Sequence, residues 1–343
     1  MHKIFPIGFA LSPLAGWLLG APWLSVAIGA VLIPLAEWLL RPRKNSAGGQ
    51  SAGPRLQWGR TMPRIVLALV VAQTLWFGFQ ADTFSWHTTL WLALSCGYVG
   101  GGTGIVLAHE LDHRRAWLDG ALCRLHLLMV GFGHYALEHN RGHHRGVATH
   151  ADPATARRHE SLWQFLPRYY RGVLRDSIAL SRKMPGPFNE ALALLAATLM
   201  LFAAAFIVAG APGLVFFLMQ AAIAQLLVGA VDYLEHWGLV RQTLNGKTER
   251  LTERHIWDAP SVVSEVMLFN LPRHAAHHLK PWLQCDALTR SDTAPQMPTG
   301  YAGMVILAWI PQLYKKIMTP RLPVDTLTIN PPLMANPVES KPV

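Results

Sequence analysis

The stretch YALEHNRGHHRGVATHADP, from Tyr135 to Pro153, carries four of the 16 histidines of the chain and is set between hydrophobic runs. An imidazole ring is costly to bury unless its nitrogen atoms find a partner. The stretch therefore raises the question of what these rings bind. It predicts a fold in which apolar helices bring clustered histidines to a shared site.

The composition around this stretch is that of a membrane protein. Of the 343 residues, 51% are hydrophobic and 15% are charged, whereas a soluble domain has about 25% charged residues. The three cysteines, Cys96, Cys123 and Cys285, are far apart and form no Cys-x-x-Cys pair. This excludes a disulfide framework and a thiolate-bound iron or zinc centre within the chain. Histidine is therefore the metal-capable residue in excess.

Six segments are long and apolar enough to span a bilayer, which takes about 20 residues each. The short connections GAP, DTFSWH and GAPG join them in pairs and contain no Lys or Arg. Of the 30 Lys and Arg residues, five lie in 41–61, twelve in 109–187 and eleven in 235–343. The positive-inside rule then predicts that both termini are cytoplasmic, and it explains the net charge of +10 without nucleic-acid binding. The predicted spans are about 4–20, 22–40, 62–81, 87–108, 188–209 and 213–234.

These spans predict an all-α membrane protein with a cytoplasmic histidine-rich region. Residues 1–234 are expected to form the six-helix bundle, with a cytoplasmic insertion at 109–187, and residues 235–322 to complete the metal site. The Gly/Ser-rich segment 45–55 is expected to be a linker, and the Pro-rich tail 323–343 to be poorly ordered. No strand is expected.

Nine histidines fall in four short motifs: HELDH at 109–113, EHNRGHH at 138–144, DYLEHWG at 232–238 and RHAAHH at 273–278. Residues three or four apart share one face of a helix, so each motif with several histidines aims them at one point. One zinc ion is usually satisfied by four ligands, so nine rings indicate two ions. The predicted ligands are His109, His113, His139, His143, His144, His236, His274, His277 and His278.

Carboxylates near these motifs are expected to support the rings and not to replace them. A ligating histidine usually donates its other N–H to a carboxylate or carbonyl. The candidates within reach in sequence are Glu110, Glu138, Asp152, Asp232 and Glu235. Isolated histidines such as His126 and His255 are expected to be hydrogen-bonded structural residues, and His134 and His150 are weaker candidates for a supporting role.

The four motifs in this order, followed by PQMPTGYAGMVILAWIP at 295–311, resemble the integral-membrane alkane monooxygenases of the membrane fatty acid desaturase and hydroxylase superfamily. The resemblance runs from about Gly100 to Leu322. The EHNRGHH…DPAT and DYLEHWGL forms are closer to the alkane hydroxylases than to the desaturases.

The resemblance implies two iron ions (Fe²⁺/Fe³⁺) held by the nine histidines, and an O₂-dependent monooxygenase that hydroxylates a hydrophobic substrate such as an alkane. It also implies a separate rubredoxin or ferredoxin with its reductase as electron donor, and a place in the cell inner membrane. The chain departs from the family pattern at three positions: Ala276 replaces an acidic residue, Asp232 an asparagine and Trp237 a tyrosine.

Several alternatives remain open. The same centre suits aromatic-methyl hydroxylation, fatty acid desaturation or fatty acid decarboxylation, and Arg114, Arg141 or Arg273 would suit a fatty-acid carboxylate. A metal transporter or sensor would need ionisable residues inside the spans, where Glu37 is the main example. The stretch GYVGGGTG at 97–104 either packs helices closely or leaves a channel for the substrate.

Overall fold

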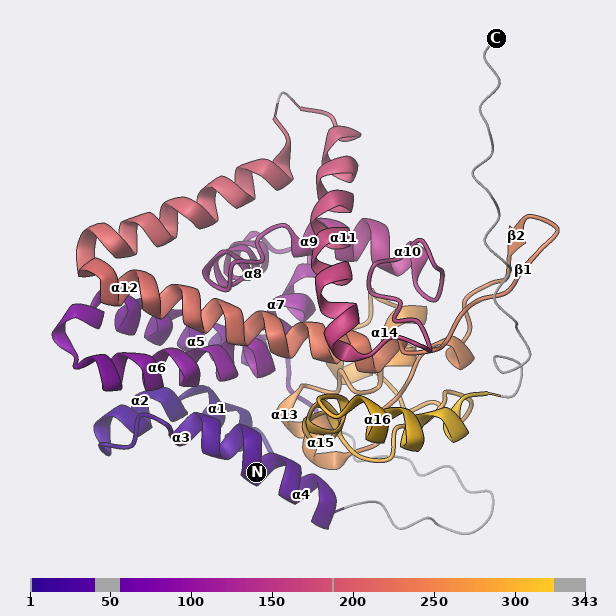
Figure 1. Ribbon diagram of the computed structural model, residues 1–343, viewed down its shortest axis with the longest axis horizontal. Helices are drawn as coiled ribbons and strands as arrows, with labels where there is room; N and C mark the ends of the chain where they lie inside the picture. Colours follow the sequence, from indigo (N-terminus) through magenta and orange to yellow (C-terminus); the bar gives the residue numbers. More distant parts are fainter. Residues whose placement is uncertain (1, 41–55, 187, 324–343) are drawn as a thin grey trace.

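The computed structural model describes residues 2–40, 56–186 and 188–323 of a mainly helical protein (Figure 1). The predicted linker 45–55 and all but the first residue of the predicted tail lie outside the described residues. Helices that are far apart in sequence lie side by side, and their ends meet around one region of the molecule (Figure 1).

The N-terminal pair of predicted spans is built from short helices. These are α1 (Ile4–Ala10), α2 (Ser12–Leu18), α3 (Leu24–Ala27), the π-helical turn η1 (Ile28–Leu32) and α4 (Ile33–Leu39). Pro13 and Pro34 lie in the first turns of α2 and α4, where a missing backbone N–H is tolerated. The predicted hairpin is present, but the apolar helix Leu24–Leu39 is shorter than the helices that qualify as membrane spans.

Three helices among the described residues are long and apolar enough to cross a membrane. The first is α5 (Thr61–Phe79). The second runs from Trp86 to Asp112 and comprises α6 (Trp86–Val99), the π-helical turn η3 (Gly100–Gly104) and α7 (Ile105–Asp112). The third is α12 (Glu190–His236), which merges the fifth and sixth predicted spans and bends sharply at Ala209 and Gly210 (Figure 1). Gly210 has a φ of 62°, a conformation that favours glycine.

The second arm of α12 packs against α6 through small residues. A Cβ on Gly97 would lie 2.7 Å from the Gln220 carbonyl oxygen, and a Cβ on Gly101 would lie 2.6 Å from Ala224 Cα. These glycines therefore permit the close approach of two helix backbones. Gly101 and the neighbouring Gly102 also line an apolar cavity. Close packing of the helices is thus confirmed, and a channel for the substrate stays a prediction.

The segment predicted as a cytoplasmic insertion begins with α8 (Trp117–Met129), which packs against α5, α7 and α12. It continues with α9 (Tyr135–Glu138), the π-helical turn η4 (His139–His143), α10 (His144–Gly146) and α11 (Leu162–Arg182). A capping box of Ser161 and Gln164 begins α11. Figure 1 shows α11 crossing the second arm of α12, against which it packs.

The C-terminal region contains a small hairpin that the sequence analysis missed, so the expectation of no strands was wrong. Strands β1 (Thr243–Leu244) and β2 (Lys247–Thr248) pair antiparallel around Asn245 and Gly246, which both have positive φ. Asn-Gly is the strongest short-range hairpin signal. The remaining elements are η2 (Ala81–Thr83), η5 (Glu253–His255), α13 (Val262–Met267), α14 (His274–Leu279), η6 (Cys285–Ala287), α15 (Tyr301–Ala308), α16 (Pro311–Met318) and η7 (Thr319–Arg321).

Candidate metal centre

Four segments that are distant in sequence bring their histidines to one place. They are α7 with the residue after it, the η4–α10 segment, the last residue of α12, and α14. All nine rings are buried or half-buried and meet in pairwise contacts. The residues brought together are His109, His113, His139, His143, His144, His236, His274, His277 and His278.

Five of the rings direct nitrogen atoms into one small volume, where the candidate ligand atoms all lie within 4.8 Å of one another. His139 Nε2 lies 2.7 Å from His109 Nε2 and 2.9 Å from His144 Nε2. His113 Nε2 lies 3.3 Å from His109 Nε2. This set, with His277 as its fifth member, is termed the five-histidine group.

The other four rings lie beside a carboxylate. His143, His236 and His278 form one set within 4.8 Å, and Glu235, His236 and His274 form an overlapping set. His274 Nε2 lies 3.0 Å from His278 Nε2 and 3.2 Å from Glu235 Oε2. These five residues are termed the carboxylate-supported group.

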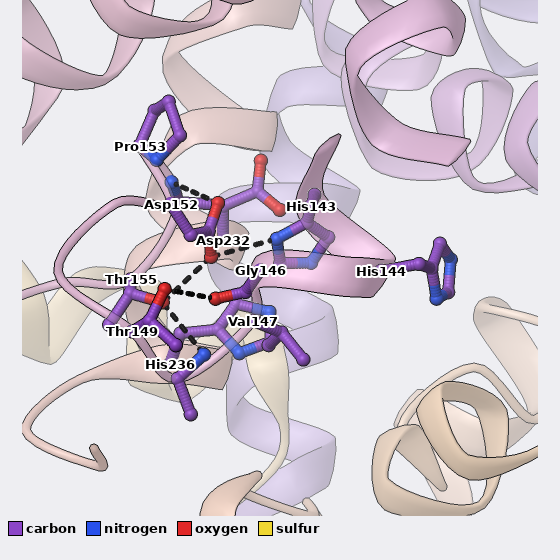
Figure 2. Close-up of polar contacts among 12 residues, drawn as sticks. His143, His144, Gly146, Val147, Thr149, Asp152, Pro153, Thr155, Asp232 and His236 are labelled. Atoms are coloured by element: carbon purple, nitrogen blue, oxygen red, sulfur yellow. Dashed lines mark hydrogen bonds and ion pairs between the residues drawn. The ribbon is translucent and has the colours of Figure 1, made fainter. Parts of the chain in front are cut away.

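The π-helical turn η4 decides which ring joins which group. In an α-helix His139 and His143 would share a face, as their spacing led us to expect. In a π-helix the backbone hydrogen bond spans five residues instead of four, and such turns are frequent at functional sites. His139 therefore aligns with His144 in the five-histidine group, while His143 enters the other group. Figure 2 shows His143 and His144 projecting in different directions from adjacent positions.

Burial keeps most of the rings neutral, which is the form that binds a metal ion. Desolvation lowers the pKa of His113 to about 4, and desolvation together with His143 lowers the pKa of His144 to about 2. His143 is the exception. Burial lowers its pKa, but the Asp152 carboxylate more than offsets this effect and raises the pKa to about 9.

The nitrogen atoms in the cluster fit metal ions better than they fit a hydrogen-bond network. His143 Nε2 and His277 Nε2 are buried without a hydrogen-bond partner. A neutral imidazole offers one donor and one acceptor, so hydrogen bonds alone do not account for several Nε2 atoms gathered in one volume. A set of imidazole nitrogens suits Zn, Cu, Fe or Ni. The histidine groups can therefore hold metal.

Asp152 holds the ring of His143 in place (Figure 2). Its Oδ2 lies 3.0 Å from His143 Nδ1 and accepts a hydrogen bond from Thr155 Oγ1 at 2.7 Å, while Ala154 N–H donates to Oδ1 at 3.0 Å. These contacts fix the carboxylate, which in turn fixes the ring so that Nε2 faces the cluster. This is the arrangement expected of a carboxylate that orients a ligating histidine.

The contact between Tyr301 and Glu235 was not predicted from the sequence. The Tyr301 hydroxyl donates to Glu235 Oε1 at 2.6 Å, while Glu235 Oε2 faces His274. Glu235 was expected only to support a ring, but its oxygen lies among the metal-capable atoms. Tyr301 belongs to the PQMPTGYAG stretch that carried the resemblance, yet no spacing rule pairs it with Glu235.

The other three predicted carboxylates make different contacts. Glu110 accepts from Arg114 Nη2 at 2.8 Å, and Asp232 accepts from the Tyr169 hydroxyl at 2.5 Å. Glu138 is buried, which raises its pKa to about 8. Within the described part of the chain, none of the three is hydrogen-bonded directly to one of the nine rings.

His126, which lies outside the cluster, and Ala276, which departs from the family pattern, both lie among ordinary structural contacts. His126 Nε2 lies 3.1 Å from the Gly100 carbonyl oxygen, as expected of a structural residue. Ala276 leaves the first turn of α14 without an acidic side chain. Asp258 instead binds this helix from outside, since its Oδ1 accepts from Ala275 N–H at 2.8 Å.

Two cavities of apolar character adjoin the cluster. One of about 30 Å³ is lined in part by His109 and His139. The other, of about 80 Å³, is a neighbouring cavity, and Gly101 and Val231 line both. His109 and His139 therefore face a small, mainly apolar space.

A basic pocket adjoins the cluster from another direction. It has a volume of about 330 Å³, and its wall includes Arg157, Arg171, Arg175 and the buried Asp152. Asp152 lines this pocket and is hydrogen-bonded to His143. One side chain, Asp152, therefore links the pocket to the carboxylate-supported group. The pocket is termed the arginine pocket.

Known proteins match most of the length of this chain. Residues 84–307 match the family model for fatty acid desaturases. The chain is 35% identical over 271 residues to an alkane 1-monooxygenase from Pseudomonas putida, which covers 76% of this chain and 66% of the relative. It is 32% identical over 330 residues to alkane 1-monooxygenase 2 from Pseudomonas aeruginosa, covering 89% and 87%.

A more distant relative is the xylene/toluene monooxygenase hydroxylase component of Pseudomonas putida, 26% identical over 237 residues, or 67% of this chain and 63% of the relative. The matched part of the chain spans about two thirds of the first relative, the Pseudomonas putida alkane 1-monooxygenase. The family match includes all nine clustered histidines and the apolar helices that deliver them. The protein is therefore an oxidoreductase of a membrane-protein family, and this chain belongs to the alkane monooxygenases within the fatty acid desaturase family.

Proposed function

We propose that the protein is a membrane-bound, non-haem di-iron monooxygenase that hydroxylates an unactivated C–H bond of a hydrophobic substrate such as an alkane. The observation that carries the proposal is the convergence of nine histidines from four segments into two adjacent groups, each of a size for one ion. The relatives named alkane 1-monooxygenase support the choice of reaction.

In this proposal the two histidine groups hold two iron ions, and Glu235 is a further candidate ligand. Bound iron supplies the activation of O₂ and the oxidation of the C–H bond. The protein supplies position: Asp152 orients the His143 ring, and Tyr301 holds Glu235. The apolar cavity beside the cluster receives the substrate and excludes water, which prevents side reactions.

The reaction requires electrons, since R–H + O₂ + 2 e⁻ + 2 H⁺ gives R–OH + H₂O. The sequence has no Cys-x-x-Cys pair that would hold an electron-carrying iron centre. We infer that a separate rubredoxin or ferredoxin with its reductase supplies the electrons. The arginine pocket offers a positively charged surface next to Asp152 and His143. This surface would complement an acidic surface on the carrier.

The proposed location is the cell inner membrane, with both termini and the histidine cluster on the cytoplasmic side. The distribution of Lys and Arg outside the predicted short connections supports this orientation. A cytoplasmic cluster would be accessible to a soluble electron carrier, while its apolar cavity would receive substrate from the bilayer.

Metal and product analysis test the proposal. Protein purified in detergent is expected to contain about two irons per chain, from the nine-ligand count, and to convert octane to an octanol only with O₂ and an electron carrier. Zinc alone, or the absence of metal from protein in which all nine histidines are intact, would contradict it. An iron-loaded protein that transports or senses metal without oxidising any substrate would favour the non-enzymatic alternative.

Aromatic-methyl hydroxylation is the second candidate, favoured by the match to the xylene/toluene monooxygenase component. Turnover of xylene in preference to octane would support it. Fatty acid desaturation or decarboxylation is a further alternative. Of the three arginines that would suit a fatty-acid carboxylate, Arg114 and Arg273 are bonded to Glu110 and Glu265, whereas Arg141 is exposed. Product analysis with a fatty acid separates these outcomes.

A further inference from the structure

The apolar cavity of about 80 Å³ contains polar groups that a simple alkane would leave unused. Glu37 and Thr103 line it, from α4 and the π-helical turn η3, and both are almost fully buried at 2% and 1% exposure. A buried polar group without a partner costs free energy. The polar groups in the wall therefore indicate a ligand that carries a polar group of its own.

Glu37 is anchored in a fixed position. Its Oε1 accepts a hydrogen bond from the Ser264 hydroxyl, and its Oε2 accepts from Gly303 N–H at 2.8 Å, so that it caps the first turn of α15. A carboxyl group offers more acceptor sites than these bonds occupy, and Glu37 lines the cavity. Glu37 is therefore a preorganised hydrogen-bond acceptor in an otherwise apolar wall.

Thr103 is the complementary observation. Its Oγ1 is buried and has no hydrogen-bond partner, although most buried hydroxyl groups have one. A threonine hydroxyl both donates and accepts. The cavity thus presents one fixed acceptor, Glu37, and one free hydroxyl, Thr103.

We propose that this cavity binds the hydroxyl end of a primary alcohol, whose opposite end reaches the histidine cluster. An alcohol hydroxyl donates once and accepts, and the proposal pairs it with Glu37 as acceptor and Thr103 as donor, which line the same cavity. An alkane terminus has neither capacity. This inference rests on the proposed monooxygenase function and names the substrate class for that same site.

The hydrogen bonds along the cavity wall indicate that the alcohol is compact. Ser264 Oγ, which is bonded to Glu37, also accepts from the backbone N–H of Tyr301 at 2.9 Å. The hydroxyl of the same tyrosine bonds to Glu235 in the carboxylate-supported group. One tyrosine residue therefore spans from the polar end of the cavity to the carboxylate-supported group. This short separation suits a short chain or a single ring better than a long chain.

The reaction on such a substrate balances in the same way as the proposed one. For an alcohol HO–R–H, O₂, two electrons and two protons give the diol HO–R–OH and water. The C–H bond breaks at the end near the histidine cluster, and the original hydroxyl is unchanged. The electrons come from the carrier already proposed.

The experiment compares 1-hexanol with heptane, which has a methyl group in place of the hydroxyl. Thr103→Val removes the unpartnered hydroxyl and disturbs no other hydrogen bond of that side chain. We expect it to reduce the preference for 1-hexanol over heptane by about threefold to tenfold, the range for one hydrogen bond. The preference is measured as kcat/KM for the iron-loaded enzyme and as Kd by calorimetry with metal-free protein in nanodiscs.

Thr198→Val is the matched control, because Thr198 is also buried with an unpartnered hydroxyl but lines neither apolar cavity. It is expected to leave the preference unchanged. An unchanged preference in Thr103→Val, or equal loss of both ligands, would overturn the proposal. If the loaded enzyme oxidises neither compound, the proposed function fails, while the Kd values of the metal-free protein still decide whether the cavity selects the hydroxyl group.

Discussion

The two halves of the histidine cluster are built from different chemical groups. The five-histidine group offers only neutral imidazoles as candidate ligands, whereas the carboxylate-supported group adds Glu235 and bonds His143 to Asp152. An anionic oxygen offsets the charge of a bound cation, and a carboxylate bonded to a ligating ring raises the basicity of that ring. The two halves are therefore expected to respond differently to the same kind of substitution.

The comparison also shows that the halves are not independent sites. The η4–α10 segment and α14 each contribute rings to both groups. A change in either segment would move both ions, whereas α7 contributes to one group and α12 to the other. Substitutions that separate the groups must therefore remove one side chain without moving the backbone.

Removal of one ring from each half is expected to have the largest effect. His139→Ala should release the ion of the five-histidine group, and His143→Ala the ion of the carboxylate-supported group. Each should lower substrate oxidation by more than about a hundredfold, the upper figure for loss of a supporting residue. Iron per chain, with Mössbauer spectra of the remaining ion, checks the assignment. Loss of both ions, or retention of both, in each variant would show that the division into halves is wrong.

Asp152→Asn is expected to weaken only the carboxylate-supported group. In the unmodified protein the Asp152 carboxylate orients His143 and raises the pKa of its ring. The variant removes this charge. Loss of such a supporting carboxylate typically costs about 10–100-fold in metal affinity. Competition with a chelator measures this loss for each ion. Asp176→Asn, which removes a carboxylate paired with the exposed Arg175, is the control and should bind both ions as the unmodified protein does.

Tyr301→Phe is expected to have a smaller effect on the same half. It removes the hydroxyl that donates to Glu235 at 2.6 Å. A typical hydrogen bond contributes about 0.5–1.5 kcal/mol, so metal affinity in this group should fall by about twofold to tenfold. Tyr314→Phe is a matched control, because the Tyr314 hydroxyl is buried without a partner. Equal losses in the two variants would remove Tyr301 from the support of Glu235.

Glu110→Gln is expected to have the smallest effect on the metal ions. Glu110 is paired with Arg114 and is not hydrogen-bonded to a clustered ring among the residues that the structure describes. The variant should lower the free energy of unfolding by about 1–2 kcal/mol and leave the iron content unchanged. Thermal unfolding and metal analysis on one preparation check both expectations. Loss of iron would instead give Glu110 the supporting role that its position in the HELDH motif suggested.

Much of the helical architecture could be predicted, because an apolar run of sufficient length is a local property. The Trp86–Asp112 helix and the bend at Gly210 lie where the spans and the GAPG connection indicated. The broken N-terminal helices could not be predicted from hydropathy, which does not register prolines and π-helical turns. The hairpin at Asn245–Gly246 was missed although its turn signal was present, because its strands are only two residues long.

The sequence by itself indicated which histidines come together, since histidines repeated within a few positions are visible without any fold. Only the tertiary structure decided how the nine rings divide into two groups, because the π-helical turn η4 replaces the expected alignment of His139 with His143. The tertiary structure also decided which partner each buried carboxylate contacts. Glu235 reaches Tyr301, and Glu37 reaches Ser264, across separations of 66 and 227 residues. Contacts over such separations depend on how whole helices pack, and no local pattern encodes them.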